Sequence, residues 1–171
     1  GPPLPDGTIP VYGLLADWKR PHIGFNGRRV YAPRGDDFAH FYTGKHVTTR
    51  EGTRIPTGPV IVDTVHPDLA MQASDAQAFY AHTGCAVADV ALYSNEFGIV
   101  AAGAIRPDVD HVKVRRLMAS DISPDWRRTR RGAPLKITAL LAVNASGFCV
   151  EGLAASAGVL RPFGLKDQYG E

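Results

Sequence analysis

The amino-acid sequence predicts an α+β fold, in which a mostly antiparallel sheet curls like a barrel and two or three helices surround it. Six or seven short apolar runs, rich in β-branched residues and bounded by Gly, Pro and Asn, have the composition of strands. Only two or three stretches carry helix-terminus signals. Strands and helices do not alternate regularly, as they would in a parallel sheet built from βαβ units.

The first 65 residues predict short strands joined by turns. The expected strands cover residues 11–16, 46–49, 53–55 and 60–65. Glu51 and Gly52 lie between the second and third runs and predict a hairpin there. The run 60–65 is apolar and β-branched, which indicates a buried strand. We expect it to end at His66, because Pro67 has no N–H to donate to a sheet.

The second half predicts two helices among further strands. Ser74 and Gln77 have the spacing of a capping box, and Gly84 is a suitable stop for that helix. Asp108 is a natural N-cap for a second helix that runs to about Met118. The expected strands cover residues 85–92, 99–105 and 135–144, with a short extended stretch at 122–123 before an arginine-rich loop at 127–131.

Length and composition predict one globular domain over residues 1–171. The chain is 44% hydrophobic and 21% charged, which is ordinary for such a domain. No apolar run approaches the ~20 residues that span a bilayer, and residues 1–10 do not resemble a signal peptide. The initial Gly-Pro predicts a tag remnant at residues 1–2, and hence a piece of a longer protein. Residues 1–10 and 152–171 are expected to be flexible.

Several kinds of site are disfavoured. The six histidines show no paired ligand spacing, and no glycine-rich phosphate loop is present, so we expect neither metal nor cofactor. Cys85 and Cys149 lie in apolar stretches and are expected to pack as small hydrophobes, with a catalytic Cys–His pair as the alternative. The net charge of +2 does not by itself indicate nucleic-acid binding. The arginines at 127–131 predict a solvated face, with phosphate binding as the minor alternative.

Nucleophile chemistry is the remaining class. A serine hydroxyl needs a base to take its proton, and the base needs a third group to orient it. His66 stands at a predicted strand end, although such a histidine is more often structural. Ser120 and Ser123 lie where a helix gives way to an extended stretch, where serines more often act as caps. Local chemistry does not choose between the two serines.

Asp89 is a candidate for the third group. It lies inside an otherwise apolar predicted strand, where an ionised carboxylate is costly unless it is paired. An exposed face of an edge strand would explain it without any function, and a partner such as His66 would make it part of a site.

A series of segments spans most of the chain, at residues 11–18, 21–24, 41–44, 66–69, 83–90, 103–107, 119–127, 140–144 and 147–148. In their sequence and their order these segments resemble the capsid maturation (prohead) serine proteases of actinobacterial tailed phages. The resemblance implies a fold related to the herpesvirus assembly proteases. It also implies an endopeptidase that cleaves scaffold and major capsid protein segments inside the immature capsid, in the host cytoplasm. A homodimer is a further implication, since related viral proteases are often activated by dimerisation.

The resemblance also assigns roles to residues. The family's histidine matches His66 and its nucleophile best matches Ser123, with Ser120 as the alternative. Asp89 belongs to a shared segment and is carried over as the group that orients His66.

The residue after the candidate nucleophile departs from the family. Relatives often have Gly there, whereas this chain has Pro124, which cannot donate a backbone N–H to an oxyanion. Arg127 and Arg128 are then the expected oxyanion donors, through backbone N–H groups or a side chain. The rival hypothesis is a catalytically silent assembly module that keeps the protease fold.

Overall fold

The computed structural model describes residues 3–23, 29–42, 44–49, 51–68, 70–81 and 83–148, and the backbone of 154–155. Its strands are β1 (Pro10–Asp17), β2 (Lys45–Thr48), β3 (Arg54–Ile61), β4 (Ala86–Ser94), β5 (Gly98–Ile105), β6 (Asp121–Arg128), β7 (Leu135–Val143) and β8 (Ala154–Ala155). Its α-helices are α1 (Ala73–Phe79) and α2 (His111–Met118), and a 3₁₀ turn spans Thr83–Cys85. This is the expected α+β class.

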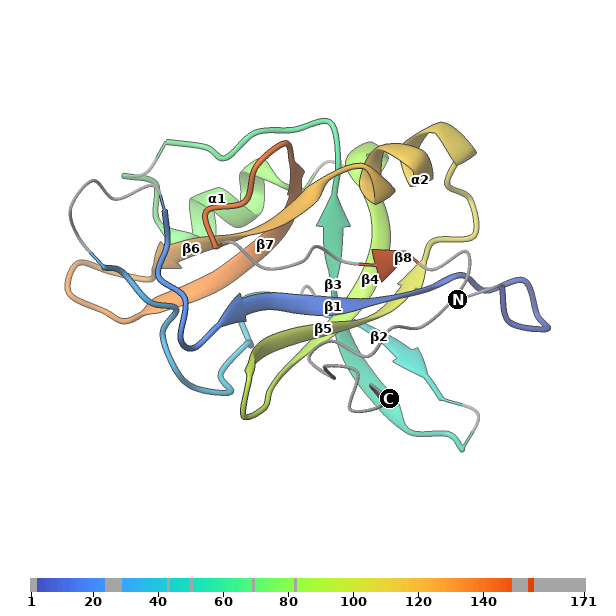
Figure 1. The fold of residues 1–171 in the computed structure, drawn as a ribbon, viewed down its shortest axis with the longest axis horizontal. Helices are drawn as coiled ribbons and strands as arrows, with labels where there is room; N and C mark the ends of the chain where they lie inside the picture. The colour runs from blue at the N-terminus through green and yellow to red at the C-terminus, as the bar shows by residue number, and fades with distance from the viewer. Residues whose placement is uncertain are drawn as a thin grey trace, which may run out of the picture.

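The strands form one curled sheet in the order β6-β7-β3-β4-β5-β1-β8, with β2 paired to β3 as a projecting hairpin (Figure 1). Neighbouring strands are antiparallel except β3 and β7, which run parallel, so the sheet is mixed. The curl brings β1 into contact with β6, near the other end of the sheet, and produces a half-barrel. Strand β6 is an edge strand of this sheet.

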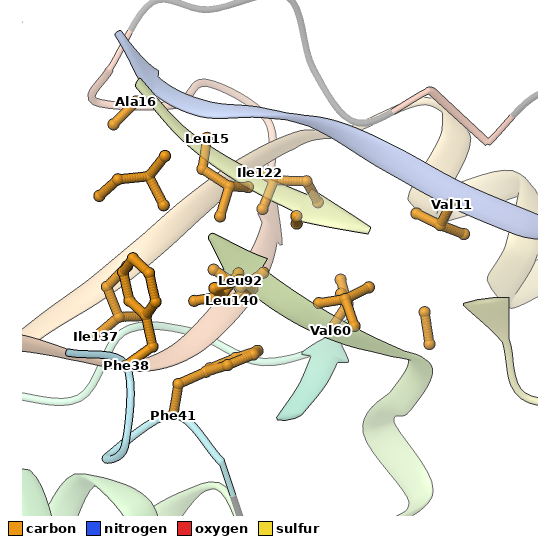
Figure 2. Packing of buried hydrophobic residues seen from close by; sticks show 14 of the residues in the cluster. Val11, Leu15, Ala16, Phe38, Phe41, Val60, Leu92, Ile122, Ile137 and Leu140 are labelled. Carbon is orange, nitrogen blue, oxygen red and sulfur yellow. The ribbon is translucent and has the colours of Figure 1, made fainter. Parts of the chain in front are cut away.

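Two apolar clusters hold the layers together. The larger fills the concave side, where Leu15, Phe41 and Leu140 are fully buried (Figure 2). The smaller lies between α1 and the opposite face of the sheet. It consists of Ile61, Ala76, Tyr80, Ala139 and Leu141. On the α1 side of β6 and β7, Asp125 and Arg127 are buried, whereas Ser123 is partly exposed.

The chain leaves the sheet earlier than expected before His66. Strand β3 ends at Ile61, so the prediction of a strand over 60–65 was wrong after its second residue. Asp63 adopts a left-handed backbone conformation, with φ of 57°, which an extended strand cannot contain. Residues 62–68 therefore form an irregular segment, and His66 lies within it.

The helices differ from the prediction at their starts. Gln72 is the N-cap of α1 and makes no side-chain capping bond, so the predicted capping box at Ser74 does not form. The N-cap of α2 is Asp110, two residues after the predicted cap. Its side chain accepts hydrogen bonds from the backbone N–H groups of Val112 and Lys113. Among the described residues, no helix is both long and apolar enough to cross a bilayer.

The largest difference concerns the region 121–131. A continuous strand, β6, runs through Pro124 and includes Arg127 and Arg128, both of which were predicted to lie in a loop. It pairs with β7 from Asp121 to Arg128. Proline is tolerated in an edge strand, where an N–H on the open side has no strand partner. This extra length of strand places two polar side chains of the site described next, Asp125 and Arg127.

Candidate active site

Three side chains form a continuous hydrogen-bonded series. His66 Nε2 lies 3.1 Å from Ser123 Oγ, and His66 Nδ1 lies 3.0 Å from Asp125 Oδ1. One-third of the His66 side chain is exposed, whereas the Asp125 side chain is almost completely buried. Asp125 is therefore the buried end of the series, and the imidazole in its middle is partly open to solvent.

Strand geometry places Ser123 and Asp125 together. Side chains two residues apart on a strand point to the same face, here the face covered by α1. Ser123 pairs with Leu141 and Asp125 with Ala139, and both partners belong to the cluster beneath α1. The ladder then shifts register after Asp125, leaving Thr138 of β7 as the extra residue of a bulge.

The segment that carries His66 is anchored from two sides. At its start Asp63 accepts a hydrogen bond from Arg116 of α2, with the two atoms 2.7 Å apart. At its end the Arg127 guanidinium donates to the main-chain oxygens of Pro67, at 2.9 Å, and of Asp68. An irregular segment so anchored can hold an imidazole in one orientation without belonging to the sheet.

Asp125 is surrounded by donors. Arg127 Nε bridges its two carboxylate oxygens at 2.9 and 3.0 Å, and the Tyr80 hydroxyl donates to Oδ2 at 3.1 Å. Thr138 Oγ1 lies 3.2 Å from the same Oδ2. Burial alone would raise the pKa of Asp125, but the hydrogen bonds from His66 and Arg127 outweigh burial and hold this pKa below its usual value. Asp125 is therefore a buried carboxylate.

The same environment acts on Tyr80. Burial raises the pKa of its hydroxyl, and the negative charge of Asp125 raises it further. The hydroxyl is consequently protonated and can serve as a donor to the carboxylate.

The ionisation of Asp125 assigns the imidazole tautomer. A carboxylate only accepts hydrogen bonds, so His66 Nδ1 must carry the proton that faces it. In the neutral ring Nε2 then has a lone pair, which accepts from the Ser123 hydroxyl. This arrangement can draw the proton from Ser123 while the carboxylate stabilises the imidazolium that results.

Two predicted residues lie apart from this series. Ser120, the alternative nucleophile, donates its hydroxyl hydrogen bond to the Arg116 carbonyl, so it acts on the end of α2. Asp89 was predicted to orient His66, and the structure corrects this: both its oxygens bind Arg106, at 2.8 and 2.9 Å. Asp89 pairs with Ala104 across β4 and β5, and Arg106 lies two residues beyond on the same face, so a diagonal cross-strand ion pair explains the carboxylate.

The predicted oxyanion donors also have other partners. Arg127 is almost fully buried, and its three guanidinium nitrogens bind Asp125 and the carbonyls of Pro67 and Asp68. Arg128, on the opposite face of the strand, donates to the Ala133 carbonyl. These bonds contradict a role for either guanidinium at Ser123, whereas donation through the backbone N–H groups of the two arginines stays a prediction.

Asp125 was not predicted as a site residue, although the spacing of polar residues around it indicates one. Ser123, Asp125 and Arg127 alternate with Pro124 and Trp126, the period of a strand that presents one polar face. Because residues 127–131 were predicted to form a loop, Arg127 was not recognised as part of this alternation.

A pocket of about 640 Å³ opens beside His66. Its walls come from the segment 62–66, the end of α2 and the end of β7. Most of its lining is apolar, and Val65, the residue before His66, is 69% exposed. The charged residues in its wall, Arg116 and Asp63, are paired with each other.

Other chemistries find less support in the described part of the chain. Burial raises the pKa of the Cys85 thiol, which disfavours the reactive thiolate. Cys149 lies outside the described residues. Within those residues no group of three or more His, Cys, Asp or Glu side chains is arranged to hold a metal ion.

Comparison with known proteins adds no assignment: the chain matches no protein-family model and no curated protein.

Proposed function

We propose that this protein is a serine endopeptidase in which Ser123 is the nucleophile, His66 the general base and Asp125 the group that orients His66. The observation that carries the proposal is the pair of hydrogen bonds on the two ring nitrogens of His66, one to Ser123 and one to Asp125. Nucleophile, base and orienting acid in this relation are the parts that acyl transfer requires.

The proposed reaction proceeds in two halves. Ser123 Oγ attacks the carbonyl carbon of the scissile peptide bond while its proton passes to His66 Nε2. The C–N bond breaks, the leaving amine takes that proton, and the acyl group stays on Ser123 as an ester. Water then attacks the ester and gives a proton to His66 Nε2. His66 returns this proton to Ser123 Oγ, and the acid is released.

The proposed substrates are scaffold and major capsid protein segments of a tailed phage, cleaved inside the immature capsid in the host cytoplasm. The resemblance to phage prohead proteases supports this choice, and so does the pocket lined by His66, which gives an extended peptide space next to the proposed general base. A relationship of the curled sheet to the herpesvirus assembly proteases, and a homodimer, are parts of the same proposal.

A fluorophosphonate tests the catalytic part, because it reacts with a serine only when that serine is activated. Labelling of the purified chain followed by peptide mapping is expected to place the modification on Ser123. Ser123→Ala should abolish labelling, whereas the matched variant Ser120→Ala should keep it, since Ser120 binds a carbonyl of α2.

Absence of labelling in a folded wild-type chain would overturn the proposal and favour the catalytically silent assembly module. Labelling that persists in Ser123→Ala and disappears in Ser120→Ala would move the nucleophile to Ser120.

A further inference from the structure

Arg127 is the most deeply buried charged side chain among the described residues, with 1% of its side chain exposed. A guanidinium stays protonated in proteins, so this burial places a full positive charge in the interior. Such a charge is retained only where an opposite charge and further acceptors compensate for the lost water. The identity of those acceptors indicates what the residue does.

The acceptors come from two parts of the chain that β-pairing does not connect. Nε binds both oxygens of Asp125, on the same strand, at 2.9 and 3.0 Å. Nη1 and Nη2 bind the carbonyls of Asp68 and Pro67, in the irregular segment that carries His66. The planar guanidinium presents its donors in a rigid fork, so its bonds to one group restrict the position of the other.

His66 is the residue held between these two anchors. Its Nδ1 binds Asp125 Oδ1, the same oxygen that accepts from Arg127 Nε, and its main chain is directly followed by Pro67. The position of the imidazole is therefore fixed by its partner Asp125 and by the main chain that follows it. Arg127 binds both Asp125 and that main chain.

We propose that Arg127 is a positioning residue: its guanidinium joins Asp125 to the Pro67–Asp68 main chain and thereby sets the orientation of the His66 imidazole toward Ser123. The inference rests on the proposed function for its catalytic meaning, but the orientation of His66 can be measured without any substrate.

The chain contains a matched control. Arg106 also binds both oxygens of an aspartate: its Nε and Nη2 donate to Asp89 at 2.9 and 2.8 Å, and neither residue is among the hydrogen-bond partners of the His66 side chain. Lysine at either position keeps the charge but loses the fork, so it can no longer bind all the acceptors at once. If weakening an Arg–Asp pair were by itself enough to disturb the orientation of His66 or the reactivity of Ser123, then Arg127→Lys and Arg106→Lys should both disturb them.

Two readouts report the orientation. The first is the far-downfield proton NMR signal expected for a His66 Nδ1–H bound to a carboxylate. The second is the rate at which a fluorophosphonate labels Ser123. We expect Arg127→Lys to remove or broaden the signal and to slow labelling more than tenfold, with Arg106→Lys within twofold of wild type in both. Equal effects in the two variants, or an unchanged signal in Arg127→Lys, would overturn the inference.

The outcomes separate this inference from the proposed function. If the wild-type chain shows the Nδ1–H signal but is never labelled, the proposed function fails while the positioning role is still decided by the NMR comparison. If Arg127→Lys does not fold, a measurement on the wild-type chain tests the inference instead. Arg127 Nε–H and His66 Nδ1–H meet at one oxygen and should show a nuclear Overhauser effect, whose absence from a resolved spectrum would overturn the inference.

Discussion

Ser123 and Asp125 stand two residues apart on the edge strand β6, and their side chains bind opposite nitrogens of the same imidazole, His66. One short stretch of strand thus supplies both the proposed nucleophile and the acid, and the base enters from a segment almost sixty positions earlier. This arrangement makes the proposed site sensitive to the register and regularity of β6.

The identity of the acid leads to the first prediction. Asp125→Asn keeps the size of the side chain but removes the charge that stabilises the imidazolium and assigns its tautomer. We expect activity to fall on the order of 10³–10⁴-fold, measured as the fluorophosphonate labelling rate or as kcat on a cleavable peptide. Asp89→Asn is the matched control and should leave the rate within a few fold. A larger loss in Asp89→Asn than in Asp125→Asn would return Asp89 to the site.

The pKa of Asp125 predicts how stability depends on pH. Because the folded-state pKa lies below the usual value of 3.8, the group stabilises the folded state above pH 3.8 and loses this contribution as pH falls through the lowered pKa. The wild-type free energy of unfolding should therefore drop more between pH 5 and pH 2 than that of Asp125→Asn. Urea titrations at several pH values measure both, and contributions from other carboxylates cancel in the comparison. Identical pH profiles would contradict the prediction.

Tyr80 tests how much each donor around Asp125 matters. Tyr80→Phe removes one hydrogen bond to Oδ2, but Arg127 and Thr138 still bind that oxygen. Because the bond is to a charged group, we expect a loss of roughly 1.5–3 kcal/mol in the free energy of unfolding and only a small change in labelling rate. Phe79→Leu, at the half-exposed neighbouring position, serves as the control. A loss of activity as large as that in Asp125→Asn would mean that Tyr80 has a direct role.

The pocket beside His66 predicts substrate preference. Its lining is mainly apolar and its two opposite charges neutralise each other, so we expect peptide phosphonates with an aliphatic side chain next to phosphorus to react faster than those with a lysine side chain. Val65→Glu places a carboxylate in the exposed wall and should reverse this order, with little effect on folding.

Val112→Glu, at an exposed position on α2 outside this pocket, is the control and should keep the wild-type preference. A small fluorophosphonate without a peptide should label Val65→Glu and wild type at similar rates. An unchanged preference in Val65→Glu would show that peptide substrates do not use this pocket.

Much of the fold was predictable because it depends on local patterns. The run that became β7 and the two runs that became β4 and β5 carry their apolar pattern in consecutive residues. The predictions of strand bounds failed where the position of a residue in the folded sheet overrode the local sequence pattern. The extended stretch at 122–123 was expected to give way to an arginine-rich loop, but β6 lies at the sheet edge, where Pro124 is accommodated, and it continues to Arg128. The apolar run before His66 suggested a long strand, but the left-handed turn at Asp63 ends the pairing early.

By itself the sequence determined the fold class, most strands, and the choice of His66 as a residue to test, and it left both Ser120 and Ser123 as candidate nucleophiles. Only the tertiary structure decided which carboxylate faces His66. A partly buried carboxylate pairs with the cation that the fold places next to it, and for Asp89 that cation is Arg106, just beyond the end of the neighbouring strand β5. Asp125 and Arg127 join His66 because β6 continues past Pro124, and this depends on a position at the sheet edge that no local pattern encodes.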